Sequence, residues 1–179
     1  MSPPSNRSTL NRHKRSCVLS KLTEKSDLVI TIRPMRPADL PVLMALEQIC
    51  FSDPWPRDAF ESVFEEANWH GIVALHQKEI IAYACWLMGV GELHLANIAV
   101  HPDYRRKSVA RRLLRRILYH ARQSGCEMIL LEVRPSNTAA RLFYEREGFT
   151  VMYERPGYYQ HPREKALVMV RRLQTDGDE

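Results

Sequence analysis

The sequence lacks long hydrophobic runs, paired cysteines and clustered histidines. No apolar run reaches about 18 residues, which excludes an ordinary membrane-spanning helix, and the N-terminus has no hydrophobic segment typical of a secretory signal. The four cysteines, Cys17, Cys50, Cys85 and Cys126, are widely spaced, and three of them lie in apolar runs. The seven histidines show no metal-ligand spacing. We therefore expect a cytoplasmic protein with free thiols, no metal and no membrane contact.

Positive charge is moderate and concentrated. The formal charge is +5, and much of it lies in the N-terminal stretch and in one arginine-rich segment after residue 104. This distribution favours a local anion site over a surface that coats nucleic acid. No aromatic-rich RNA motif accompanies the arginines, so we expect no direct nucleic-acid contact from the domain, with RNA binding as a minor alternative.

One domain fits a chain of 179 residues. Residues 1–27 are rich in Ser, Pro, Asn, Arg and Lys, which predicts a disordered basic tail. A basic arm for ribosomal RNA, an organellar targeting peptide or a misassigned translation start are the alternatives for this tail. Residues 28–173 form the predicted domain, and residues 174–179 a short acidic tail.

Hydrophobic periodicity predicts strands and helices in alternation. Strands are expected at Val29–Arg33, Trp69–His76, Glu79–Val90, Leu93–Val100, Glu127–Arg134, Phe149–Glu154 and Ala166–Arg172. Helices are expected at Pro37–Cys50, with Leu40, Val42, Leu43, Leu46 and Ile49 inward, at Asp58–Glu66, anchored by Phe60 and Phe64, from Ala110 onward, and at Asn137–Glu147. This order predicts an α/β fold with a mixed, mostly antiparallel sheet and helices on both faces.

The segment from Asn97 to Ala110 joins a strand to a basic helix. The apolar face of that helix carries Val109, Ala110, Leu113, Leu114, Ile117, Leu118 and Ala121, and the opposite face carries Arg111, Arg112, Arg115, Arg116 and Arg122. Free backbone N–H groups and the helix dipole at such a turn suit a pyrophosphate. Because the chain has no Walker-type Gly-Lys-Ser/Thr here, an ordinary turn with solvated arginines is the alternative.

Two polar residues lie in otherwise apolar surroundings further along. Glu132 interrupts the run from Ile129 to Val133, where a carboxylate needs either a salt bridge, for instance to Arg134, or a cleft in which it could act as a general base. Tyr144 follows in the next helix, and a buried hydroxyl needs a partner. Both could converge on one cleft. Asn137 is placed as the N-cap of that helix and Gly148 as its C-cap.

These segments resemble a known family. Ile98-Ala99-Val100, Pro102 and Arg105-x-x-Ser108-x-Ala110 resemble the acetyl-CoA signature of the GNAT acetyltransferase superfamily, with Ser108 where glycine is preferred. The stretch from Leu131-Glu132-Val133-Arg134-x-Ser136-Asn137 through Phe143-Tyr144 to Gly148-Phe149 is similar to the RimI branch, the bacterial ribosomal-protein alanine N-acetyltransferases. Arg33-Pro34-Met35, Ala38-Asp39-Leu40, Phe51-Ser52-x-Pro54-Trp55 and Tyr158-Tyr159 fit the same branch.

The resemblance implies a GNAT fold whose sheet splays between its fourth and fifth strands to seat acetyl-CoA. It implies Glu132 as general base and Tyr144 as general acid. The implied acetyl-CoA contacts are Ile98, Ala99, Val100, Arg106, Lys107, Ser108, Val109, Ala110, Arg111 and Asn137. Tyr158 and Tyr159 would lie over the N-terminus of a ribosomal protein, or else would belong to a stabilised loop between the last two strands.

Two other functions stay open at this point. One is a GNAT enzyme for lysine side chains or small amines, against which Tyr158-Tyr159 argues. The other is a CoA-binding module that lost catalysis through the change at Ser108, against which the retained Glu132 and Tyr144 argue. Direct transfer to a neutral amine needs no nucleophilic cysteine.

Overall fold

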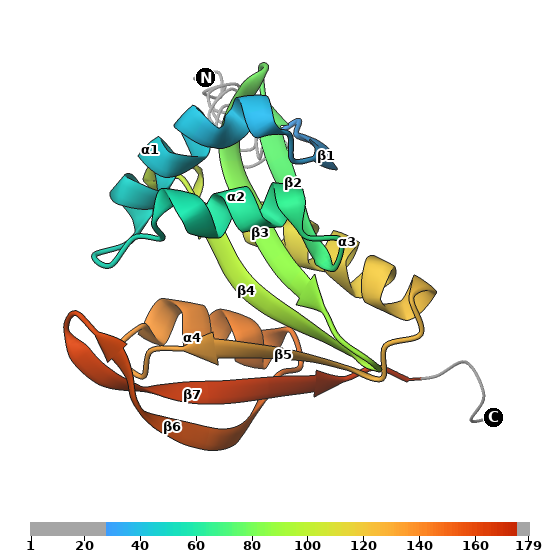
Figure 1. The fold of residues 1–179 in the computed structure, drawn as a ribbon, viewed down its shortest axis with the longest axis vertical. Helices are drawn as coiled ribbons and strands as arrows, with labels where there is room; N and C mark the ends of the chain where they lie inside the picture. Colours follow the sequence, from blue (N-terminus) through green and yellow to red (C-terminus); the bar gives the residue numbers. More distant parts are fainter. Residues whose placement is uncertain (1–27, 175–179) are drawn as a thin grey trace, which may run out of the picture.

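Strands and helices alternate along residues 28–174, the part of the chain that the computed structural model describes (Figure 1). The helices are α1 (Leu40–Cys50), α2 (Arg57–Glu65), α3 (Val109–Gln123) and α4 (Thr138–Arg146), with short 3-10 turns at Pro37–Asp39 and Pro102–Tyr104. The strands are β1 (Thr31–Pro34), β2 (Trp69–His76), β3 (Glu79–Met88), β4 (Glu92–Val100), β5 (Met128–Val133), β6 (Thr150–Gln160) and β7 (Arg163–Arg172). The predicted tail 1–27 and residues 175–179 of the acidic tail lie outside the described residues.

The seven strands form one mixed sheet in the order β1-β2-β3-β4-β5-β7-β6. All neighbouring pairs are antiparallel except β4 and β5, which α3 connects as a crossover. The parallel ladder runs only from Glu92 opposite Met128 to Leu95 opposite Leu131. Beyond it β4 stays paired with β3 while β5 diverges, so the two halves of the sheet open like a V (Figure 1). The predicted fold, including the splay between the fourth and fifth strands, is confirmed.

Helices pack on both faces of the sheet. Because neighbouring strand residues point to opposite faces, β3 contributes Tyr83 and Cys85 to the core under α1 and α2, and Ala82 and Ala84 to the core under α3. The predicted stripe of α3 is confirmed: Val109, Leu113, Leu114, Ile117, Leu118 and Ala121 are buried, and its five arginines are exposed. Ala110 is half-buried.

The inward face predicted for α1 is partly wrong. Val42 and Ile49 are 45% and 54% exposed, because the buried stripe runs through Leu40, Leu43 and Leu46 and places these two on another side of the helix. In α2, Phe60 is fully buried, whereas Phe64 is only half-buried.

The cysteines within the described residues are free thiols. Cys85 and Cys126 are buried and Cys50 is half-buried, and Cys17 lies outside the described residues. Among residues 28–174, none of the helices has both the length and the apolar character needed to cross a membrane.

Candidate active site

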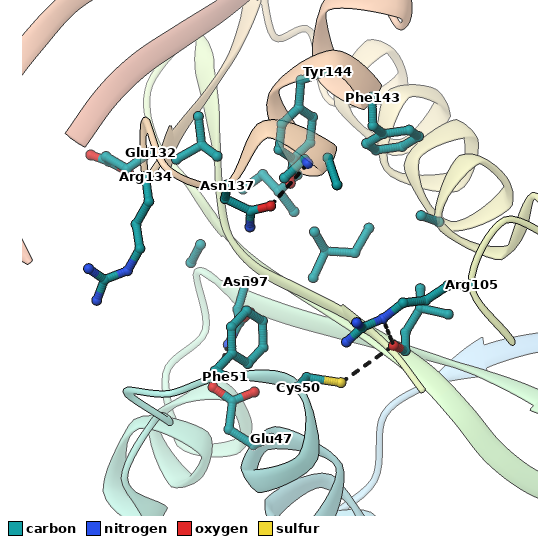
Figure 2. Close-up of a pocket in the computed structure, with 18 of the residues that line it drawn as sticks. Glu47, Cys50, Phe51, Asn97, Arg105, Glu132, Arg134, Asn137, Phe143 and Tyr144 are labelled. Atoms are coloured by element: carbon teal, nitrogen blue, oxygen red, sulfur yellow. Dashed lines mark hydrogen bonds between the residues drawn. The ribbon is translucent and has the colours of Figure 1, made fainter. Parts of the chain in front are cut away.

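A cavity of about 1040 Å³ occupies the opening between the two halves of the sheet (Figure 2). One wall comes from α1, the segment after it and β4. The other comes from β5, α4 and the far end of β6, and the turn before α3 closes one end. The divergence of β5 leaves the β4 segment from Ala96 to Val100 without a strand partner on that side. The cavity therefore has an unpaired strand edge along it, which suits an extended ligand.

The basic turn before α3 adopts an unusual backbone conformation. Arg106 and Ser108 both have φ of +61°, in the left-handed region that non-glycine residues rarely adopt. Ser108 is the N-cap of α3, and Ser108, Val109, Ala110 and Arg111 line the cavity. Backbone N–H groups at such a turn and at the first helical positions form a concave anion site.

Two of the residues predicted to contact acetyl-CoA do not line the cavity. Ile98 and Val100 line it, but Ala99 is 3% exposed and packs in the core under α1. Lys107 lies over the ring of Tyr104, with 5.3 Å between Nζ and the ring centroid, and is absent from the lining. The Val100 carbonyl oxygen already accepts hydrogen bonds from Arg105 Nε (3.0 Å) and Cys50 Sγ (3.4 Å).

Glu132 projects from β5 at the inner end of the opening, with 12% of its side chain exposed. Its Oε2 lies 2.5 Å from His94 Nε2 on β4, and its Oε1 lies 3.7 Å from Arg155 Nη1 on β6. The salt-bridge alternative is confirmed with a different arginine: Arg155 pairs with Glu132, whereas the Arg134 guanidinium pairs with Asp53 and Glu164. Glu132 keeps one oxygen without a close hydrogen-bond donor among the described residues.

Tyr144 lies on α4 across the cavity from β4, and its side chain is almost fully buried (Figure 2). Burial raises the pKa of its hydroxyl above the ordinary tyrosine value, so the group stays protonated at neutral pH. Asn137 lines the cavity too, and its Oδ1 accepts a hydrogen bond from the Ala140 N–H at 3.1 Å. The predicted N-cap is confirmed.

Tyr158 and Tyr159 line the cavity from β6, with ring centroids 4.9 Å apart. Both lie inside a strand that extends to Gln160, so the alternative of a loop is wrong. Arg155 lies over the ring of Tyr158 (4.8 Å) and Arg134 over that of Tyr159 (3.9 Å). Burial raises the pKa of Tyr159 to about 12, so its hydroxyl is neutral and can donate.

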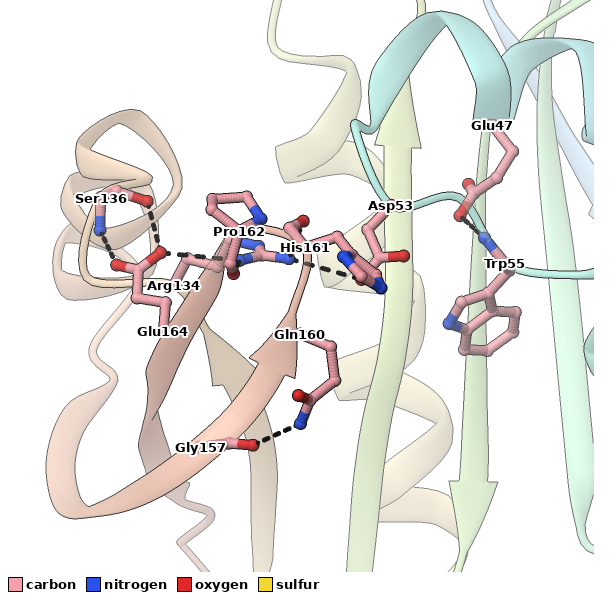
Figure 3. Close-up of polar contacts among 10 residues, drawn as sticks. All are labelled: Glu47, Asp53, Trp55, Arg134, Ser136, Gly157, Gln160, His161, Pro162 and Glu164. Atoms are coloured by element: carbon pink, nitrogen blue, oxygen red, sulfur yellow. Dashed lines mark hydrogen bonds and ion pairs between the residues drawn. The ribbon is translucent and has the colours of Figure 1, made fainter.

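Arg134 contacts both the β6–β7 turn and the segment that follows α1 (Figure 3). Its guanidinium donates to the carbonyl oxygens of Pro162 (2.9 Å) and His161 (3.0 Å) in the β6–β7 turn. It lies 3.6 Å from the carboxylate of Asp53, in the segment between α1 and α2, and 3.6 Å from that of Glu164. The β6–β7 turn, which follows Tyr159 in the chain, is thus held toward the opposite wall.

Glu47 is a buried carboxylate that the sequence reasoning missed. It is 1% exposed and accepts hydrogen bonds from the Trp55 N–H (2.9 Å), Asn97 Nδ2 (3.1 Å) and the Tyr83 hydroxyl. Burial raises its pKa. A signal existed, since Glu47 continues the stripe of Leu40 and Leu43 at helical spacing. Because its carboxylate accepts three hydrogen bonds, Glu47 links α1 to β3, to β4 and to the segment between α1 and α2, and it is not a free base.

Among residues 28–174, no group of three or more His, Cys, Asp or Glu side chains is arranged to hold a metal ion. The residues that line the cavity offer a carboxylate, a protonated phenol, backbone amides and an anion-binding turn.

Comparisons with known proteins agree with this geometry. The model of the acetyltransferase (GNAT) family matches residues 40–149. The [ribosomal protein bS18]-alanine N-acetyltransferase of Escherichia coli K12 is 33% identical over 141 residues, which are 78% of this chain and 95% of the relative. A Bacillus subtilis protein described as a putative enzyme of the same name is 28% identical over 139 residues, 77% of this chain and 92% of the relative.

Solved structures give the same result. The crystal structure of the ribosomal-protein-S18-alanine N-acetyltransferase from Escherichia coli superposes with a TM-score of 0.77 at 31% identity, covering 84% of this chain and 98% of that chain. Arabidopsis thaliana NAA60 in complex with acetyl-CoA superposes with a TM-score of 0.74 at 17% identity, covering 81% and 99%, which supports the fold alone.

Proposed function

Because the chain belongs to the acetyltransferase (GNAT) family, we propose that it transfers an acetyl group from acetyl-CoA directly to the N-terminal amine, that of alanine, of a ribosomal protein. The observation that carries the proposal is the 33% identity, over most of both chains, to an enzyme named for this reaction. Glu132, Tyr144, Tyr158 and Tyr159, which the reaction would use, all line one cavity.

Glu132 acts as the general base. Its Oε1 accepts a proton from the substrate amine, directly or through a water, and the nitrogen forms a bond to the acetyl carbon. The carbon–sulfur bond then breaks, and the Tyr144 hydroxyl gives its proton to the departing thiolate. An α-amine has a pKa of roughly 7.7–8.0, whereas lysine at about 10.4 costs about 3 kcal/mol more to deprotonate. A single carboxylate therefore suffices for an N-terminal substrate.

The acetyl-CoA molecule lies along the unpaired edge of β4, with backbone groups of Ile98 and Val100 beside its pantetheine arm. The pyrophosphate binds the amides of the turn at Arg106 to Arg111. Asn137, at the N-terminus of α4, also contacts the acetyl-CoA. Ala99 and Lys107, predicted here as contacts, would take part through their backbone atoms alone.

Tyr158 and Tyr159 cover the incoming peptide N-terminus in this proposal. Their protonated hydroxyls can donate to peptide carbonyls, and the two rings form an apolar wall that fits the methyl side chain of alanine. The compartment we propose is the cytoplasm, which agrees with the free thiols of Cys50, Cys85 and Cys126. The proposed reaction needs no metal, and the domain needs no contact with nucleic acid or membrane.

Replacing Ser108 with glycine is expected to tighten acetyl-CoA binding by about fivefold, because without a Cβ the backbone can approach the pyrophosphate more closely. The left-handed strain is present with and without the cofactor, so its relief is expected to raise the free energy of unfolding, by roughly 1 kcal/mol, and not the affinity. Calorimetric titration with acetyl-CoA measures the change. Lys78→Gly is the matched control, because Lys78 also has a left-handed backbone, with a φ of +75°, but does not line the cavity. Weaker binding by the Ser108→Gly variant would mean that the serine hydroxyl contacts the cofactor.

Replacing Arg134 with methionine is expected to raise the peptide KM by about tenfold, because the β6–β7 turn and Tyr159 lose their anchor. Affinity for acetyl-CoA is expected to stay the same, since Arg134 lies on the peptide side of the site. Steady-state kinetics with a peptide of fixed sequence measures the change. Arg163→Met is the control, because Arg163 is exposed and lies in the β6–β7 hairpin that Arg134 contacts. An unchanged peptide KM would contradict the role.

The proposed activity is tested by incubating the protein with acetyl-CoA and a short peptide that begins with alanine. The same peptide with a blocked N-terminus is the control, and calorimetry reports acetyl-CoA binding in parallel. Transfer to the free peptide alone is expected. Binding of acetyl-CoA with no transfer to N-terminal peptides or to other amines would favour the inactive CoA-binding module, and transfer to small amines alone would favour the other GNAT activity.

A further inference from the structure

His94 lies directly behind the carboxylate that we assign as general base. It is on β4 and pairs with Leu130 of β5 in the parallel ladder. Side chains alternate along a strand, so His94, Leu130 and Glu132 project from the same face of the sheet. The His94 ring approaches Glu132 from the side of the paired strands and is not part of the cavity lining. Its Nε2 lies 2.5 Å from Glu132 Oε2.

The surroundings of Glu132 make this bond decisive for the orientation of the carboxylate. Arg155 from β6 lies 3.7 Å from Oε1, which exceeds hydrogen-bond length, and its side chain is 58% exposed. Tyr158 is also on β6. Burial and, to a lesser extent, the negative charge of Glu132 raise its pKa, but no hydrogen bond joins the two side chains among the described residues. His94 is therefore the close donor that fixes which oxygen faces the cavity.

We propose that His94 is a positioning residue for catalysis: its Nε2–H donates to Glu132 Oε2 and so directs Oε1 toward the substrate amine. The inference rests on the proposed role of Glu132 as base. The parallel β4–β5 ladder brings the two side chains together at its last residue pairs before the sheet opens. Arg155 already lies 3.7 Å from Oε1, and without His94 the carboxylate can rotate closer to that guanidinium, which would withdraw Oε1 from the amine.

The test compares His94→Leu with His94→Gln. Leucine removes the donor and is expected to lower kcat by about tenfold, the effect typical of one hydrogen bond to a charged group. Glutamine places an amide N–H near the position of Nε2 and is expected to restore kcat to within about threefold of the wild type. The peptide KM and acetyl-CoA affinity are expected to stay unchanged in both variants.

The control is His76→Leu, a change in a β2 histidine whose ring bonds to the Val29 carbonyl oxygen and which does not line the cavity. It is expected to keep wild-type kcat. Thermal unfolding of all three variants separates lost activity from lost folding. If His94→Leu keeps wild-type kcat, or if His94→Gln loses as much as His94→Leu while remaining folded, the proposal is overturned.

A double-mutant cycle separates this inference from the proposed function. Once Glu132→Gln has removed the base, adding His94→Leu is expected to cause no further loss of kcat. Equal losses in both backgrounds would mean that His94 acts independently of Glu132, which overturns the positioning role while leaving the base in place. Wild-type turnover by Glu132→Gln alone would overturn the base assignment, and the role of His94 with it.

Discussion

Substitution of Glu132 by glutamine is expected to lower kcat by about 10²- to 10⁴-fold, the range for loss of a general base. Glutamine keeps the size of the side chain and can still bond to His94, but it cannot accept the amine proton. Affinity for acetyl-CoA is expected to stay the same, because Glu132 lies on the amine side of the cavity. Single-turnover kinetics with an alanine-starting peptide, together with calorimetry, measures both quantities.

The matched control for this change is Glu154→Gln. Glu154 lies on β6 in the same half of the sheet, is exposed and pairs only with Lys165 among the described residues. Its replacement is expected to leave kcat unchanged. Unaltered turnover in the Glu132 variant would remove Glu132 from the mechanism, and a large loss in both variants would point to a general effect of charge.

Substitution of Tyr144 by phenylalanine is expected to lower kcat by about 10²-fold, because the departing thiolate loses its proton donor. The fold is expected to survive, since phenylalanine fills the same space beside Phe143 and Phe149, whose rings lie 5.2 and 5.6 Å away. Tyr153→Phe, at an exposed position of β6, is the control. Measurement of kcat and of the unfolding midpoint for both variants checks the prediction.

The pH dependence gives a second test of Tyr144. Burial raises the pKa of its hydroxyl, so the protonated, donating form persists above the usual tyrosine value of about 10. We therefore expect kcat not to fall through ionisation of Tyr144 anywhere below about pH 10. A loss of kcat near pH 8 that disappears in the phenylalanine variant would contradict this role.

Local patterns carried much of the prediction of the fold. The alternating strands and the arginine-backed stripe of α3 depend on residues close in sequence, and both were predicted. The splay between β4 and β5 entered through the family resemblance, because no local pattern encodes where two strands part. Val42 and Ile49 were misplaced because a short apolar helix offers more than one plausible inward face.

The candidate site was predicted unevenly. Glu132 and Tyr144 stood out as polar groups in apolar surroundings, and both line the cavity, although their roles stay predictions. His94 was missed because its partner comes from another strand that only the folded sheet brings near. Glu47 was also missed, although its place on the apolar stripe of α1 was a signal in the sequence. The left-handed backbone of Ser108 gives a physical reason why glycine is preferred at that position of the family signature.

N-terminal acetylation is tested most directly with one peptide that has both a free N-terminal alanine and an internal lysine. After incubation with acetyl-CoA at neutral pH, tandem mass spectrometry locates the acetyl group. Acetylation of the α-amine alone is expected, with loss of the product in the Glu132→Gln variant. Acetylation of the lysine, or of both amines at similar rates, would contradict the proposed N-terminal activity.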